Sequence, residues 1–162
     1  LSKIDLYYGD ISMPKGFEID KDQLQKNILE HIIQDCTFPF SKEWDKLNTY
    51  LREHINLEYG FTLINKLTTG LMFKPNQSNF PESENNKVDL RNSPDYVMLY
   101  GVNLKNCNVR IYYDDNRRAG RSWDIPLKNN KFIMFPSTLI YHISNNQKEQ
   151  LNFILKTTYE YI

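Results

Sequence analysis

The sequence predicts an α+β protein in which helices come first and antiparallel strands follow. Apolar residues recur at helical spacing between residues 20 and 60, whereas the chain after Tyr96 consists of short β-like segments separated by turn residues. Aromatic residues make up 14% of the chain, with eleven Tyr and nine Phe, and this composition favours strands. Short strands at regular spacing indicate a sandwich or barrel rather than a parallel sheet.

The first 60 residues carry the predicted helices. Two β-like segments, Ile4–Tyr8 and Phe17–Ile19, come before them and are separated by Gly and Pro. A first helix is predicted from Lys21 to Asp35, because Asp20 and Gln23 form a capping pair ahead of an apolar periodicity.

A second helix is predicted to start after the capping residue Ser41 and to end before Gly60. One face of this helix carries its large apolar residues, Trp44, Leu47, Leu51 and Ile55. The two amphipathic helices are thus expected in tandem.

After Gly60 the helical periodicity stops. Strands are predicted at Phe61–Leu67 and Leu71–Phe73, with a break at Gly70. The polar interval Asn76–Pro94 is predicted to be a long surface loop, a kind of segment that often carries function.

The remaining residues predict strands joined by turns. The last strand alternates, so that its odd-numbered residues share one face. The predicted strands are Tyr96–Leu104, Val109–Tyr113, Trp123–Ile125, Lys131–Phe135, Leu139–Ile143 and Leu151–Tyr161.

Composition and charge limit the functions that are expected of this chain. A chain of 162 residues with 40% hydrophobic residues predicts one domain, helical over 1–60 and β-rich over 61–162. Twenty basic and twenty acidic residues cancel, so nucleic-acid binding is not expected. No apolar run is long enough for a membrane helix. Cys36 and Cys107 lack metal or disulfide spacing and predict reduced thiols, which suits the cytoplasm.

Three segments carry a family resemblance. They are Val97-Met-Leu-Tyr-Gly-Val-Asn-Leu, Asn108-Val-Arg-Ile-Tyr-Tyr-Asp-Asp and the run from Lys131 to Asn146 that contains Phe-Pro-Ser and a later His. Together they resemble the core of the 2-oxoglutarate and iron(II)-dependent oxygenases, especially the prolyl-hydroxylase-like branch. The resemblance implies an antiparallel double-stranded β-helix (jelly-roll or cupin-like) with the two helices packed on it.

The same resemblance implies where an iron(II) site would lie. His142 matches the family's distal iron-binding His, and Asp89 or Asp95 stands near the expected carboxylate ligand. The other family His, from a His-x-Asp or His-x-Glu pair, has no counterpart, since His31 and His54 are on the predicted helices.

The implied cosubstrate site is also incomplete. The family places an Arg or Lys on the last strand for the distal carboxylate of 2-oxoglutarate, and this chain has Gln150 and Asn152 at those positions. Lys156 shares the parity of Asn152, so it is the candidate anion partner if that face points inward.

Other polar residues are candidates for ligand binding, namely Tyr100, Arg110 and Tyr112. Arg110, Tyr112 and Asp114 alternate on one strand. Either this set lines the barrel, or Val109 and the other apolar residues of the strand do and the polar set faces water.

Three functions follow as hypotheses. The first is a divergent, catalytically inactive relative that binds a small polar or peptide ligand in the barrel mouth. The second is an active hydroxylase that uses Fe(II) and 2-oxoglutarate through non-standard ligands. The third is a structural or assembly protein. Small proteins that resemble this one occur in bacteriophage genomes, which would suit the first or the third hypothesis.

Overall fold

The computed structural model describes residues 6–10, 19–35, 38, 41–79, 81, 83–84, 93–114, 121–146 and 149–162. Two helices precede most of the strands, as predicted. In chain order the elements are β1 (Tyr7–Asp10), α1 (Lys21–Gln34), α2 (Lys42–Tyr59), β2 (Leu63–Phe73), β3 (Tyr96–Asn103), β4 (Cys107–Asp114), β5 (Arg121–Leu127), β6 (Lys131–Pro136), β7 (Ile140–Asn145) and β8 (Asn152–Tyr161).

The predicted caps form as expected. The carboxylate of Asp20 accepts a hydrogen bond from the backbone N–H of Gln23, and the Ser41 hydroxyl accepts one from that of Trp44. Gly60 ends α2 in the left-handed conformation with φ 81°, which costs glycine little because it has no Cβ.

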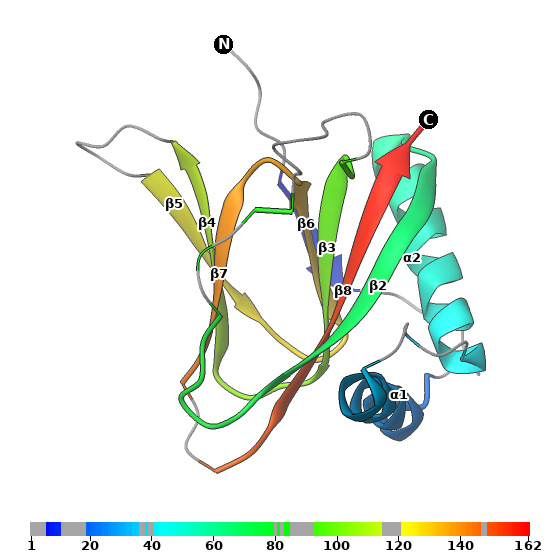
Figure 1. The fold of residues 1–162 in the computed structure, drawn as a ribbon. Coiled ribbons are helices and arrows are strands. Elements are labelled where there is room, and N and C mark those ends of the chain that lie inside the picture. The colour runs from blue at the N-terminus through cyan, green and yellow to red at the C-terminus, as the bar shows by residue number, and fades with distance from the viewer. Residues whose placement is uncertain are drawn as a thin grey trace.

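The strands form two antiparallel sheets (Figure 1). The major sheet has the order β1-β6-β3-β8-β2, and the minor sheet has the order β5-β4-β7. Figure 1 shows the two sheets facing each other, with α1 and α2 on the side of the major sheet that faces away from the minor sheet. A single bridge from Ser78 to Ser144 adds the segment after β2 to the free edge of β7.

Alternation along the strands of the major sheet separates two apolar cores. Tyr96, Met98 and Tyr100 of β3 pack with the buried faces of α1 and α2 and form the helix-side core. Val97 and Leu99 belong to the inter-sheet core instead. The inter-sheet core also contains Phe73, Cys107, Val109, Ile111, Leu127, Ile133, Phe135, Tyr141, Ile143 and Ile154.

The prediction of a strand break at Gly70 was wrong. β2 runs without interruption from Leu63 to Phe73, and Gly70 lies under α1. A Cβ at this position would be 2.9 Å from Ile28 Cγ2, so the glycine permits close packing of the helix on the strand.

The first strand also differs from its predicted bounds. β1 is Tyr7–Asp10 and pairs with β6, whereas the prediction was Ile4–Tyr8. Ile4 and Phe17 lie outside the described residues. Ile19 is described and is not in a strand.

Neither α1 nor α2 is both long and apolar enough to cross a membrane. Cys107 is a free thiol in the inter-sheet core, while Cys36 lies outside the described residues.

Candidate functional site

Lys156 places a cation between the two sheets. On β8, Phe153 and Leu155 pack in the helix-side core, while Ile154 points into the inter-sheet core. Lys156 has the parity of Ile154 and therefore points the same way. Its side chain is only 15% exposed.

Lys156 contacts a carboxylate that also accepts a hydrogen bond from a tyrosine. The Nζ atom of Lys156 lies 2.8 Å from Oε1 of Glu84, and the hydroxyl of Tyr141 donates a hydrogen bond of 2.6 Å to the same oxygen. Glu84 comes from the segment between β2 and β3, and its backbone N–H donates to the carbonyl of Ser137 after β6. We call Glu84, Tyr141 and Lys156 the interior cluster.

The interior cluster has the chemistry of a carboxylate-binding site. An ammonium group and a phenol hydroxyl both direct donors at one carboxylate oxygen, and charge-assisted hydrogen bonds of this kind are strong. Since the Glu84 side chain is only 20% exposed, water screens the ion pair less than it would on the surface. Removal of either charge would leave the other partly buried and unpaired.

His142 lies on the opposite face of β7 from Tyr141. Its neighbours Tyr141 and Ile143 fill the inter-sheet core, so the imidazole of His142 points away from the space between the sheets. Its cross-strand partner is Arg110 on β4. The family resemblance implies that this strand carries His142 toward the mouth of the barrel, and the strand alternation places its side chain on the outer face of the minor sheet.

Arg110 and Tyr112 lie on this same outer face of the minor sheet. Val109 and Ile111 are the residues of β4 that point inward, which resolves the alternative left open by the sequence. The guanidinium of Arg110 forms an exposed ion pair with Asp124, with 2.8 Å between Nε and Oδ1. The hydrogen bond from Arg110 lowers the pKa of the Asp124 carboxyl.

Tyr100 belongs to the helix-side core, on the other face of the major sheet from Lys156. Its hydroxyl donates to Oδ1 of Asn130 at 2.7 Å, and burial raises its pKa. Gln150 is an exposed residue of the turn before β8. Neither side chain belongs to the interior cluster.

Asn152 points toward the inter-sheet side but is committed to structural hydrogen bonds. Its amide nitrogen donates to Oδ1 of Asn145 at 2.6 Å and to the carbonyl of Lys105 at 3.1 Å. Its Oδ1 accepts from the backbone N–H of Lys105 at 3.0 Å. The side chain joins the β3–β4 turn to the start of β8.

Of the two candidate carboxylate ligands, the structure describes only Asp95, which contacts the end of β8. Asp95 is exposed, and its Oδ2 accepts a hydrogen bond of 3.1 Å from the backbone N–H of Tyr161. Asp89 lies outside the described residues. The described part of the chain contains no group of three or more His, Cys, Asp or Glu side chains able to hold a metal ion. Among the residues that the structure describes, His142 and Asp95 therefore do not supply the ligand set of an iron(II) centre.

The interior cluster was only partly predictable. Lys156 was a candidate because of its parity on β8, whereas Glu84 and Tyr141 were not proposed. Tyr141 has a signal in the sequence, since it alternates with His142 and both cannot face inward. Glu84 has none, because it lies in a polar segment without periodicity.

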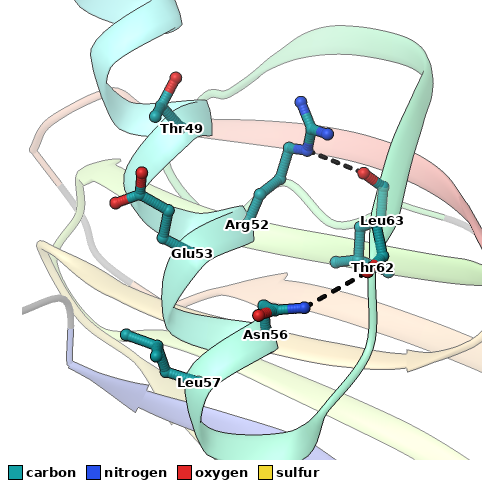
Figure 2. Close-up of a pocket in the computed structure, with 7 residues that line it drawn as sticks. All are labelled: Thr49, Arg52, Glu53, Asn56, Leu57, Thr62 and Leu63. Atoms are coloured by element: carbon teal, nitrogen blue, oxygen red, sulfur yellow. Dashed lines mark hydrogen bonds between the residues drawn. The ribbon is translucent and has the colours of Figure 1, made fainter.

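A hollow on the molecular surface lies apart from this cluster, beside α2 (Figure 2). Its volume is about 480 Å³. Arg52 reaches from α2 across the hollow and donates through Nε to the carbonyl of Leu63 at 2.8 Å, while Asn56 donates to Oγ1 of Thr62. These contacts attach the end of the helix to the start of β2. The lining residues are Thr49, Arg52, Glu53, Asn56, Leu57, Thr62 and Leu63.

No protein-family model matches the chain, and no curated protein sequence matches it. Solved structures do. A prolyl-4-hydroxylase from Pseudomonas putida superimposes with a TM-score of 0.61 at 13% identity, over 96% of this chain and 85% of that one. The viral collagen prolyl hydroxylase of Paramecium bursaria Chlorella virus-1, solved with 2OG, has a TM-score of 0.64 at 13% identity, over 95% of this chain and 94% of that one.

A third neighbour is a prolyl hydroxylase from Trichoplax adhaerens, solved with a peptide fragment of the hypoxia inducible factor. It has a TM-score of 0.63 at 8% identity, and the match covers 96% of this chain and 83% of that one. The chain thus has the fold of the prolyl hydroxylases and related 2OG-Fe(II) oxygenases, at a sequence identity that indicates strong divergence.

Proposed function

We propose that this oxygenase-like chain is a single-domain, divergent and catalytically inactive relative that binds a small polar ligand carrying a carboxylate. The ligand binds inside a double-stranded β-helix, between the two sheets, on Lys156 and Tyr141. A peptide that presents a carboxylate would use the same two contacts. The observation that carries the proposal is the inward direction of Lys156 and of the Tyr141 hydroxyl toward one carboxylate oxygen.

Physical reasons support a carboxylate as the recognised group. Lys156 is a partly buried cation, and a cation in this setting requires a counter-charge. The neighbouring residues of the inter-sheet core are apolar, which suits the carbon skeleton of such a ligand, while the two donors would orient its charged end. Among the described residues, His142 belongs to no group of three or more His, Cys, Asp or Glu side chains that could hold a metal ion.

Binding of 2-oxoglutarate and of succinate without metal tests the proposal. We expect both acids to raise the melting temperature, because a ligand that prefers the native state stabilises it. Lys156→Gln should weaken binding by roughly tenfold or more, since it removes a charge-assisted contact. Calorimetric titration measures the affinity. Lys156→Arg keeps the positive charge and should therefore retain part of the affinity.

Lys74→Gln is the matched control, because Lys74 is exposed and lies outside the inter-sheet core. Its affinity should equal that of the unmodified chain. Equal affinities for Lys156→Gln and Lys74→Gln would refute the proposed site.

An active dioxygenase is the second candidate, favoured by the fold of the neighbours. Anaerobic titration with Fe(II) and 2-oxoglutarate separates the two functions, because the chelated cosubstrate gives a visible charge-transfer band. We expect no band. A band that His142→Ala abolishes would establish the iron site and overturn the inactive assignment. If the chain binds neither a carboxylate ligand nor a metal ion, the result favours a structural role.

A further inference from the structure

One oxygen atom of Glu84 holds both donors of the interior cluster. Lys156 and Tyr141 lie on different sheets, and both contact Oε1 of Glu84, at 2.8 and 2.6 Å. Glu84 is far from both in the sequence, by 72 and 57 residues. The carboxylate therefore bridges the two sheets from a segment that belongs to neither.

We propose that Glu84 is an internal competitor for the carboxylate ligand. Its own carboxylate occupies Lys156 and Tyr141 in the free protein, and a ligand binds by displacing it. This inference rests on the proposed function, because it assigns the regulation of the same site. Glu84 then determines how tightly the chain binds an acid, without itself contacting the bound ligand.

Competition by Glu84 lowers the apparent affinity for the ligand by an amount that depends on how often Glu84 occupies the site. If Glu84 occupies the two donors most of the time, the apparent affinity falls in proportion to the fraction of molecules in which they are accessible. The ligand gains only the difference between its own contacts and those of Glu84. Replacing the internal carboxylate by a neutral group removes this competition and leaves Lys156 without its counter-charge.

Glu84→Gln is the informative variant, because the amide keeps the size of the side chain and an oxygen that Tyr141 can still contact. We expect this variant to bind succinate and 2-oxoglutarate about tenfold more tightly or better, since an incoming carboxylate now restores the charge balance around Lys156. Calorimetric titration gives the affinities. Glu58→Gln, on the exposed end of α2, is the matched control and should leave them unchanged.

The outcomes separate this inference from the proposed function. If the unmodified chain and Glu84→Gln bind acids equally well while Lys156→Gln does not bind, the site stands and the competitor is overturned. If the unmodified chain binds the acids and Glu84→Gln binds them more tightly, both proposals are supported. If no variant binds either acid, both fail.

A second variant covers a failure of Glu84→Gln to fold, which its thermal transition reveals. Glu84→Asp keeps the charge but is one methylene shorter, so its carboxylate reaches the donors less well. We expect Glu84→Asp to bind both acids more tightly than the unmodified chain does. An affinity at or below that of the unmodified chain would contradict competition.

Discussion

Amide side chains at the start of β8 hold neighbouring turns together. Asn152 is 1% exposed and exchanges hydrogen bonds with both backbone groups of Lys105. Asn145, also 1% exposed, accepts from Asn152 and donates to the carbonyl of Lys74 after β2. Polar groups buried this deeply need partners, so these hydrogen bonds stabilise the packing of the two turns and the start of β8.

Asn152→Ala should lower the free energy of unfolding by about 2–4 kcal/mol, because it leaves both backbone groups of Lys105 and the amide oxygen of Asn145 without this partner. Urea denaturation measures the change. Gln150→Ala, in the exposed turn nearby, should change it by less than about 0.5 kcal/mol. Similar small changes in both variants would show that the Asn152 network is unimportant for stability.

The pairing of α1 with β2 depends on a glycine in the strand. Gly70 has Ile28 above it, and a Cβ there would be 2.9 and 3.0 Å from the Cγ2 and Cγ1 atoms of Ile28 and 3.1 Å from its Cα. Backbone and side chain therefore both limit the space. This contact explains why the sequence signal at Gly70 was misread as a strand break.

Gly70→Ala should destabilise the protein by about 1–3 kcal/mol, the usual range for overpacking. Ile28→Ala in the same chain removes the two nearest atoms, so the double variant should lose less than the sum of the two single variants. Denaturant unfolding of all four proteins gives this cycle. Gly9→Ala is the control, because its nearest atom would be 3.6 Å away in ordinary contact. Equal stability of Gly70→Ala and Gly9→Ala would contradict this packing model.

At the scale of the whole molecule, ionisable groups are buried in both cores. Burial raises the pKa values of Tyr100 and Tyr159 in the helix-side core. In the inter-sheet core it raises the pKa of the Cys107 thiol to about 12. The folded chain therefore holds these groups in their neutral, protonated forms.

Alkaline pH should destabilise the fold. The unfolded chain releases these protons near the ordinary pKa values of 9.0 for Cys and 10.0 for Tyr, whereas the folded chain retains them. Stability is thus fully present below about pH 9 and decreases as the pH rises through the folded pKa values, by up to about 1.4 kcal/mol per pH unit for each group. Urea unfolding between pH 7 and 11 measures this slope.

Tyr159→Phe should make the decrease in stability above pH 10 less steep, even if it lowers the stability at neutral pH through loss of the hydrogen bond to Asn48. Tyr8→Phe, at an exposed position, should leave the slope unchanged. An unchanged slope in Tyr159→Phe would show that its hydroxyl does not stay protonated in the folded chain.

Local patterns in the chain were enough to predict the helices, their caps and the alternation of β8. A cap or an amphipathic face depends on residues within one or two turns, so the relevant interactions are short in sequence. The parity of Lys156 follows from the same reasoning. The sequence segments after Tyr96 that resemble the oxygenase family predicted the kind of fold that the comparisons show.

The folded chain was needed to decide which face of β7 points inward and which residue meets Lys156. A strand can place either set of alternate residues in the core, and here the sheet packing selects Tyr141 over His142. Glu84 lies in a segment without periodicity, and its contacts span 57 and 72 residues. Such contacts arise only when the two sheets come together, which is why the contacts of Glu84 with Lys156 and Tyr141 could be identified only in the tertiary structure.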